Sequence, residues 1–319
     1  MYRKNKPDLT GPIYTIFTPF DEEYLIDYSS LKAYLETLYS QGARRFYAMA
    51  YNSRYSQLSH KEIMELNAFC ARTLKDIDSR NVVIVGDPIH CSTNESIDFA
   101  KHAKDSGADL ISLIMREKYF TDEQVLEHFS LIGRTARFPI LVHEMPFLSG
   151  FDGNQMHWPS TLLEALPQVD EIVALKEDAK DIQVTRKALE LEPDISIVIA
   201  GGGKAALQSY LKYGAKSWLN GISIIDASIA EYFWNACLQE NLERQQFVIE
   251  ELEAPFFGGV VKKYGWHRTN KALLQAAGHM HRRDRMPLPH LNENEFKEVE
   301  TVYEVVAGNW ARRQEEDLS

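Results

Sequence analysis

Residues 13–40, with the sequence IYTIFTPFDEEYLIDYSSLKAYLETLYS, contain the structural unit that predicts the fold. The apolar run 13–17 has the length of a buried strand. After Asp27, apolar side chains return from Leu31 to Tyr39 at the three- and four-residue spacing of one helical face. The stretch therefore predicts a strand that is followed by an amphipathic helix.

The same alternation recurs along the chain, so this unit is the first of eight. None of the later apolar runs alternates cleanly with polar residues, which is typical of parallel strands that are buried on both faces and joined by helices. Eight strand and helix units fill roughly 250 residues in a TIM barrel, which makes an α/β fold of the (β/α)8 type the consistent prediction. The later runs are residues 46–49, 82–85, 110–114, 140–142, 172–175, 197–200 and 218–219.

The positions of three glycines also favour the barrel. Gly42, Gly107 and Gly214 each precede an alanine, close a helical pattern and come just before a predicted strand, as a left-handed glycine after a helix does. The main rival, a doubly wound open sheet, usually has a glycine-rich turn after its first strand. The chain has Thr18-Pro19-Phe20 there instead, so the barrel is favoured.

The strand pattern ends near residue 225. We therefore expect residues 1–10 to form an N-terminal tail, 11–225 the barrel, and 226–319 the last barrel helix with a C-terminal helical extension. Within this last part, the helical periodicity predicts helices over residues 229–239, 242–252, 270–277 and 293–306.

Composition favours a small-molecule function. The chain has 319 residues, of which 45% are hydrophobic and 25% are charged, as in ordinary globular proteins. Its formal net charge of −11 disfavours nucleic acid and anionic membrane surfaces as partners. No apolar leader opens the chain, and no apolar run reaches the ~18 residues of a membrane span, so we expect a cytoplasmic protein.

The cysteines Cys70, Cys91 and Cys237 are odd in number and far apart, which fits neither a disulfide framework nor a zinc site. No pair of His, Asp or Glu ends the strands at a spacing typical of metal ligands, so no metal is expected. The cationic cluster of residues 279–285 lies beyond the predicted barrel and is interpreted as a surface or interface segment.

Chemistry in a TIM barrel takes place at the C-terminal ends of the strands. Lys176 ends the apolar run 172–175. An amine in the barrel mouth has its pKa lowered by desolvation, and a neutral amine attacks a ketone to form a Schiff base. The alternative is a solvated lysine that pairs with Glu177 or Asp178.

Two further strand ends carry candidate groups. His143 is either a general acid and base or a hydrogen-bonded structural histidine. The backbone N–H groups of Gly201, Gly202 and Gly203 either bind a carboxylate or phosphate at a helix N-terminus or form a flexible turn.

At these residues the chain resembles the dihydrodipicolinate synthase and N-acetylneuraminate lyase superfamily, the pyruvate-type class I aldolases and dehydratases. The resemblance spans roughly residues 11–306, and it rests on the order and spacing of its motifs. These are the opening Gly11-Pro12-Ile13-Tyr14-Thr15-Ile16-Phe17-Thr18-Pro19-Phe20, then Leu58-Ser59-His60-Lys61-Glu62, Gly107-Ala108-Asp109, Pro139-Ile140-Leu141-Val142-His143-Glu144-Met145-Pro146 and Val173-Ala174-Leu175-Lys176-Glu177.

The resemblance implies that Lys176 forms the Schiff base with pyruvate or another 2-keto acid, with no cofactor besides this covalent bond. It also implies a homo-oligomer, a tetramer or a dimer. Tyr119 approximately matches the family's aromatic residue near the end of strand four.

The departures from the family concern the substrate. The family's Gly-Thr-Thr-Gly-Glu, which binds the keto-acid carboxylate, falls on residues 50–54, and its acid-base tyrosine falls on His143. The arginine that holds the synthase's aldehyde substrate falls on Leu148, so dihydrodipicolinate synthesis itself is not expected. Arg54 either grips the substrate carboxylate or pairs with Glu144. The substrate-binding candidates are Tyr51, which offers a hydroxyl, Asn52, Ser53, Arg54, Gly201, Gly202 and Leu219.

Two functions from different classes follow. The first is a Schiff-base lyase that cleaves or forms a carbon–carbon bond or eliminates water. The second is a degenerate family member that binds a keto acid or sugar acid as a sensor or partner subunit. Lys176 favours the lyase, because a binding module has no need of an amine at the end of a strand.

Overall fold

The computed structural model describes residues 2–50, 57–115, 120–144, 158–201 and 203–318. These residues form two compact units. The first unit consists of residues 2–15, 44–201 and 206–219, and the second of residues 16–43, 203–205 and 220–318.

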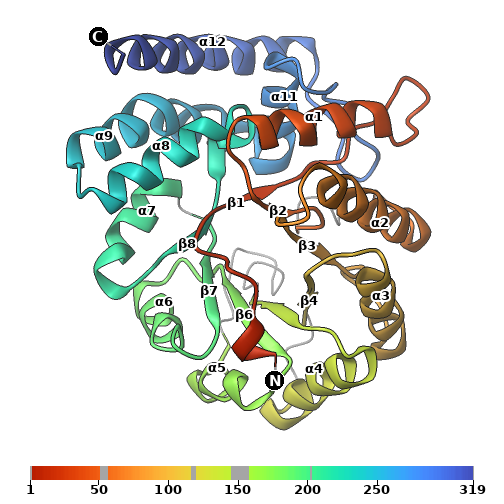
Figure 1. The fold of residues 1–319 in the computed structure, drawn as a ribbon. Coiled ribbons are helices and arrows are strands. Elements are labelled where there is room, and N and C mark those ends of the chain that lie inside the picture. The colour runs from red at the N-terminus through yellow and green to blue at the C-terminus, as the bar shows by residue number, and fades with distance from the viewer. Residues whose placement is uncertain (1, 51–56, 116–119, 145–157, 202, 319) are drawn as a thin grey trace. The chain divides into compact units, whose positions relative to one another are not determined.

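The first unit contains a closed barrel of eight parallel strands in the order of the sequence, which confirms the predicted fold. Figure 1 shows the strands as a ring with helices α2 to α6 on its outer side. The strands are β1 (Gly11–Thr15), β2 (Arg45–Tyr47), β3 (Val82–Gly86), β4 (Leu110–Ile114), β5 (Ile140–His143), β6 (Ile172–Glu177), β7 (Ser196–Ile199) and β8 (Ser217–Leu219).

The barrel closes between its first and last strands. Gly11 pairs with Ser217, and Ile13 pairs with Leu219. The strands are apolar on both faces because one face meets the helices and the other fills the barrel, as in other barrels of this kind. The buried interior cluster consists of Leu9, Ile13, Tyr47, Ala50, Ile84, Leu110, Leu141, Val173, Ala174 and Val198.

Side chains cap the helices that begin after the barrel strands. Ser59, Ser92 and Thr121 each form a capping box with the Glu or Gln three residues later, which satisfies two N–H groups at each helix start. The helices from α2 to α7 are α2 (His60–Ile77), α3 (Thr93–Asp105), α4 (Asp122–Ala136), α5 (Ser160–Ala165), α6 (Ile182–Leu189) and α7 (Gly203–Tyr210). Short 3-10 turns are η1 (Arg3–Asn5), η4 (Leu166–Gln168), η5 (Leu211–Tyr213) and η6 (Gly221–Ile224).

The glycine prediction is confirmed. Gly42, Gly107 and Gly214 have φ values of +112°, +87° and +89°. After α3, the N–H of Gly107 donates to Lys104 and that of Ala108 donates to Ala103, the bond pair of a Schellman motif. A side chain at these left-handed positions would be strained, so glycine is required there.

The second unit is helical. Its helices are α1 (Tyr28–Ser40), α8 (Ala227–Leu238), α9 (Leu242–Phe247), α10 (Lys262–Tyr264), α11 (Trp266–Ala276) and α12 (Glu293–Glu316), with π-helical segments η7 (Val248–Glu253) and η8 (Phe256–Val261). Helix α12 lies beside α11 (Figure 1). Trp310 of α12 donates its indole N–H to Asp226, the N-cap of α8.

The helix expected over 229–239 is α8, within two residues of the predicted ends, and the helix expected over 270–277 begins earlier, at Trp266. The other two differ more. The helix expected over 242–252 is α-helical only to Phe247 and continues as the π-helix η7, in which Glu253 turns inward and is buried. The helix expected over 293–306 continues to Glu316. The last turns of this helix carry few apolar residues, so the sequence shows no helical periodicity there. Hydrogen bonds from Trp310 and Arg313 hold these turns in place.

The first strand also ends earlier than predicted. β1 ends at Thr15 rather than Phe17. In the second unit, Phe17 packs against the His267 ring at 5.6 Å between centroids, and Phe20 forms an antiparallel bridge with Ile26. These residues are apolar because they pack on helices, not because they continue the sheet.

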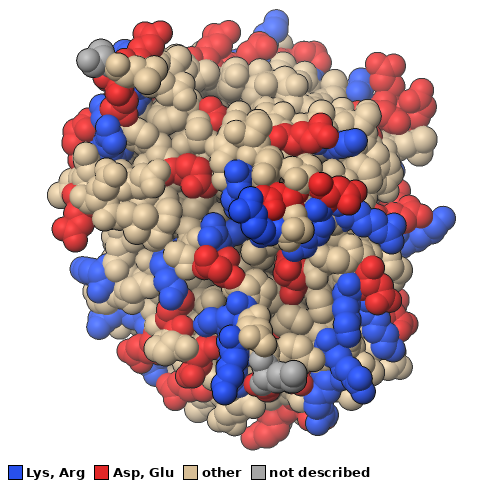
Figure 2. Space-filling view, viewed as in Figure 1, with Lys and Arg blue, Asp and Glu red and all other residues tan. Residues whose placement is uncertain are grey.

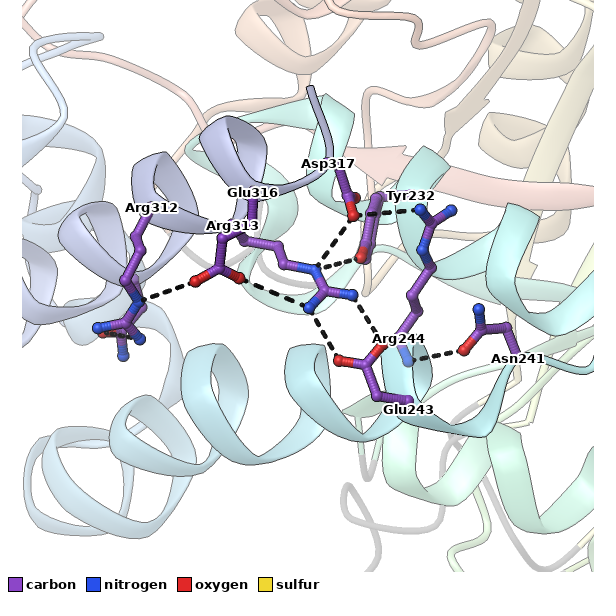
Figure 3. Close-up of polar contacts among 9 residues, drawn as sticks. Tyr232, Asn241, Glu243, Arg244, Arg312, Arg313, Glu316 and Asp317 are labelled. Atoms are coloured by element: carbon purple, nitrogen blue, oxygen red, sulfur yellow. Dashed lines mark hydrogen bonds and ion pairs between the residues drawn. The ribbon is translucent and has the colours of Figure 1, made fainter. Parts of the chain in front are cut away.

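Arg313 joins the end of α12 to α8 and α9 (Figure 3). Its guanidinium donates to both carboxylate oxygens of Glu243, at 2.8 and 2.7 Å, and to the Tyr232 hydroxyl at 2.7 Å. Asp317 lies 3.7 Å from the same guanidinium and also accepts from Arg244 at 3.1 Å. The fork geometry of arginine suits such a bidentate contact, and it fixes the C-terminal turn.

The surface mixes charges of both signs. Figure 2 shows lysine and arginine side chains interspersed with aspartate and glutamate over the face in view. Among the helices of the described residues, none is both long and apolar enough to cross a membrane.

Candidate active site

The register of two neighbouring strands brings Lys176 and His143 together. His143 on β5 and Lys176 on β6 are direct partners in the parallel ladder, so their side chains leave the sheet on the same side. The Lys176 Nζ atom lies 2.7 Å from His143 Nε2. The side chains are buried, with 3% of Lys176 and none of His143 exposed.

Asp178 lies against both of these groups. Its Oδ2 atom is 3.5 Å from Lys176 Nζ and 3.6 Å from His143 Nε2. Burial opposes the ionisation of Asp178, but the positive charge at Lys176 and the contact with His143 outweigh it and lower the pKa of this carboxyl to about 2. Asp178 is therefore an ionised carboxylate at neutral pH.

The 2.7 Å contact allows a proton to pass between the Lys176 amine and the His143 imidazole. A lysine ammonium has only donors, so Lys176 donates to His143 Nε2 when the amine is protonated. When the proton is on the imidazole instead, His143 donates to the neutral amine. The three side chains thus contain an amine that can lose its proton to an adjacent base, which is what a nucleophilic lysine requires.

Glu177 points away from this group. Its carboxyl accepts hydrogen bonds from the Ala179 N–H at 2.7 Å and from the Thr185 hydroxyl at 2.8 Å. Burial raises the pKa of Glu177 to about 7, against the effect of these two hydrogen bonds. Of the two pairing partners considered for Lys176, only Asp178 faces the amine, and Glu177 holds the turn that carries Asp178.

Gly201 lies beside Asp178, as the space around it shows. A Cβ atom added to Gly201 would lie 2.4 Å from Lys180 Cε and 3.0 Å from Asp178 Oδ1, and the φ of Gly201 is +76°. Only glycine fits at this position. The backbone just after β7 thereby approaches Asp178 closely.

The start of α7 already holds an anion from the chain. In the second unit, the Lys204 N–H donates to Glu253 Oε2 at 2.7 Å, and a Cβ atom at Gly203 would lie 2.6 Å from the same oxygen. The sequence leaves two interpretations for residues 201–203, an anion site at the helix N-terminus or a flexible turn. At the Gly203 and Lys204 end of this segment, the anion is the chain's own Glu253 carboxylate, because the π-helix η7 turns that side chain inward.

The remaining candidates divide into two groups. Leu219 on β8 is partly buried and packs against the interior cluster of the barrel, whereas Tyr51, Asn52, Ser53, Arg54, Tyr119, Leu148 and Gly202 lie outside the described residues. The roles of all of these residues remain predictions.

Asp178 was missed as a site residue because a carboxylate next to a lysine was interpreted as a simple ion pair. The signal that could have found it is strand alternation. Residues two apart in an extended chain share a face, so Asp178, which directly follows β6, lies on the same side as Lys176 while Glu177 does not.

The described residues offer neither a metal cluster nor an activated thiol. No group of three or more His, Cys, Asp or Glu side chains within the described ranges is placed to hold a metal ion. The three cysteines are free thiols, and burial raises the pKa of each, Cys70, Cys91 and Cys237, to about 12. The thiolate needed for nucleophilic attack is therefore scarce at neutral pH.

The chain is similar to known proteins over most of its length. The sequence pattern of the Dihydrodipicolinate synthetase family matches residues 8–305. A 4-hydroxy-tetrahydrodipicolinate synthase from Archaeoglobus fulgidus is 22% identical over 295 residues, which cover 92% of this chain and 96% of the relative.

Solved structures show the same fold. The dihydrodipicolinate synthase of Agrobacterium tumefaciens superposes with a TM-score of 0.78 at 20% identity, covering 93% of this chain and 98% of the other. The N-acetylneuraminate lyase of Fusobacterium nucleatum gives a TM-score of 0.77 at 15% identity, with coverages of 93% and 98%. At these identities the likeness concerns the fold alone.

Proposed function

Because the chain belongs to the dihydrodipicolinate synthetase family, we propose that it is a lyase that forms a Schiff base between Lys176 and the carbonyl carbon of pyruvate or another 2-keto acid. One observation carries the proposal. The buried Lys176 amine lies 2.7 Å from an imidazole nitrogen at the C-terminal ends of adjacent barrel strands.

The reaction begins with proton transfer from Lys176 to His143. The neutral amine then adds to the ketone carbon, and a proton passes from the attacking nitrogen to the former carbonyl oxygen to give a neutral carbinolamine. His143 donates its proton to the departing hydroxyl group, so that one water molecule leaves and the iminium forms. The base that accepts the first proton thus supplies the acid for the last step.

The iminium then acts as an electron sink. It accepts the electron pair of a breaking carbon–carbon bond, or of a C–H bond from which a base removes the proton before water is eliminated. Imidazole suits this acid-base work, because its reference pKa of about 6.5 lies close to the operating pH. His143 therefore replaces the family's tyrosine in this proposal.

The substrate carboxylate needs a separate anchor. We assign it to Arg54, with the backbone of residues 51–53 and of Gly201 and Gly202 as further donors, and with Tyr119 at the mouth. Asp178 cancels the positive charge at Lys176, so that charge does not attract the carboxylate. Arg54→Met should raise KM roughly 10- to 150-fold, the effect of losing a charged hydrogen bond, with kcat little changed.

We also infer a homo-oligomer, a tetramer or a dimer, in the cytoplasm. Two exposed leucines at the junction of α8 and α9 support a contact surface, with 64% of Leu238 and 68% of Leu242 exposed. Light scattering at micromolar concentration tests the assembly, and a monomeric mass would contradict it.

Borohydride trapping tests the lyase proposal. The protein is incubated at neutral pH with pyruvate and a panel of longer 2-keto acids, reduced with borohydride, and measured by intact mass and peptide mapping. We expect a covalent adduct on Lys176 that Lys176→Arg abolishes. Lys271, which is also fully buried and whose pKa burial lowers to about 8, is the internal control and should remain unlabelled.

Failure of the test has a defined meaning. If folded protein forms no adduct with any of these acids, the lyase proposal is wrong and a binding function takes its place. If the label is on Lys271 or on surface lysines instead, the position of Lys176 has no special reactivity, and the proposed nucleophile is wrong.

A further inference from the structure

Asp178 has the geometry of a counter-ion for both members of the proton pair. Its Oδ2 atom is 3.5 Å from Lys176 Nζ and 3.6 Å from His143 Nε2. At equal dielectric constant, these two distances change the Coulomb energy of a unit charge by only about 3%. The carboxylate therefore stabilises a positive charge on either side chain almost equally.

We propose that Asp178 neutralises the single positive charge that Lys176 and His143 share through every step of Schiff-base formation. This inference rests on the proposed function and adds a residue to it. Asp178 acts on the reacting nitrogen through its charge, and the neighbouring Glu177 has no such part because it faces Thr185.

The positive charge moves between two groups that both lie beside the Asp178 carboxylate. At rest the charge is on the Lys176 ammonium, and after proton transfer it is on the His143 imidazolium. When His143 gives its proton to the departing hydroxyl, the charge is on the iminium nitrogen, which is the former Nζ atom. Each of these states keeps one positive charge beside one negative charge in a buried site, where an unpaired charge is costly.

Other charges face the group less directly. Two carboxyl groups are next to the pair in the sequence, Glu144 after His143 and Glu177 after Lys176. Lys180, in the turn after β6, is exposed and adds positive charge near Asp178. The Asp178 carboxylate forms ion pairs with both Lys176 and His143.

Asp178→Asn is the decisive substitution, because it removes the charge and keeps the shape. Without the carboxylate, the ammonium and the imidazolium each lose a stabilising charge, so the pKa values of Lys176 and His143 fall. The active form holds one shared proton. At low pH the pair binds a second proton, and at high pH it loses the shared one, and both changes remove the active form. Because both pKa values fall, both limbs of the pH profile should move to lower pH.

The expected size follows from the distance. An opposite charge within about 4 to 6 Å shifts a pKa by about 1 to 3 units, so the profile of trapping rate against pH should move down by about 1 to 3 pH units. The iminium also loses its counter-ion, and we expect kcat to fall roughly 10- to 1,000-fold on the same scale. Asp178→Glu should recover part of both effects.

A labelling measurement makes the test independent of the substrate. Competitive labelling with acetic anhydride over a range of pH gives the pKa of the Lys176 amine without any keto acid. In Asp178→Asn this pKa should be lower than in the wild type. If the wild type forms no adduct with keto acids but this difference is seen, the charge pairing holds and the lyase proposal alone fails.

The second unit offers a matched control. There, Asp284 is buried beside His267 at 3.0 Å and Lys271 at 3.9 Å. Asp284→Asn removes the same kind of charge from a unit that does not contain Lys176, and it should leave the Lys176 pKa and the trapping profile unchanged. If it does not fold, Asp109→Asn, which breaks a partly exposed pair with Lys75, takes its place.

Two results would overturn the inference. The first is an Asp178→Asn variant that folds, as judged by near-ultraviolet circular dichroism, and keeps the wild-type Lys176 pKa. The second is a lower rate with an unshifted pH profile, which would mean that Asp178 only supports the local structure.

Discussion

Lys204 is fully buried, and its replacement by methionine tests how the start of α7 is held. The Lys204 Nζ atom donates to Glu253 Oε1 at 3.0 Å, to the Ser223 hydroxyl at 3.1 Å and to the Asn220 carbonyl at 3.1 Å. Lys204 is 0% exposed and Glu253 is 3% exposed. Water therefore cannot replace these contacts when the amine is removed.

The cost can be estimated from what remains. In Lys204→Met, the Glu253 carboxylate stays buried and keeps the backbone N–H of residue 204 as a donor. Removing one partner of a buried ion pair destabilises a protein by about 3 to 5 kcal/mol, because the other charge is left uncompensated. Adding Glu253→Gln removes that charge, so the double variant should regain about 1 to 3 kcal/mol.

Urea unfolding followed by circular dichroism measures both changes. Lys187→Met is the control, because Lys187 pairs with Glu164 at 3.2 Å on the surface, with 49% and 61% of these side chains exposed. Such pairs contribute about 1 kcal/mol or less. The reasoning is refuted if Lys204→Met costs no more than Lys187→Met, or if Glu253→Gln adds to the loss instead of reducing it.

Three further predictions concern the acid-base group, a buried lysine and the C-terminal turn. His143→Phe should leave the Lys176 adduct detectable by mass while lowering kcat by roughly 10²- to 10⁴-fold; an unchanged kcat would exclude His143 as the proton carrier. Burial lowers the pKa of Lys271 from 10.5 to about 8, so between these values the unfolded chain binds more protons and stability rises with pH. From pH 8 to 10.5, the unfolding free energy of the wild type should therefore rise by up to about 3 kcal/mol relative to that of Lys271→Met. A difference between the two proteins that stays constant with pH would contradict the pKa shift. Arg313→Met should cost about 1 kcal/mol and speed amide exchange in the last turn of α12, with a smaller loss at high salt; equal exchange in both proteins would mean that the Arg313 contacts do not hold that turn.

The strands were predictable from the sequence because each is a short apolar run. Parallel strands covered on both faces must be apolar throughout, and the glycines that end the helices mark where the next strand begins. The bounds were less certain where apolar residues serve another purpose. Phe17 extends the first run, but it packs on His267 in the second unit, and a one-dimensional pattern does not distinguish these cases.

The candidate site was predictable only where position along a strand determines it. Lys176 and His143 end neighbouring strands, and the ladder register then brings their side chains together. The Glu253 contact has no such local signal. It depends on the π-helix η7, which begins at Val248, and on a partner at Lys204 that lies far away in the sequence.

Closure of the barrel also bears on how the chain folds as it is synthesised. β1 is made first, but its pairing with β8 must wait for roughly 200 more residues, because Gly11 pairs with Ser217. Until then one edge of β1 is open, and such edges promote pairing between different chains. The N–H of Gly11, which donates to the carbonyl of Lys216 in the closed barrel, is one of the groups that this edge exposes until β8 arrives.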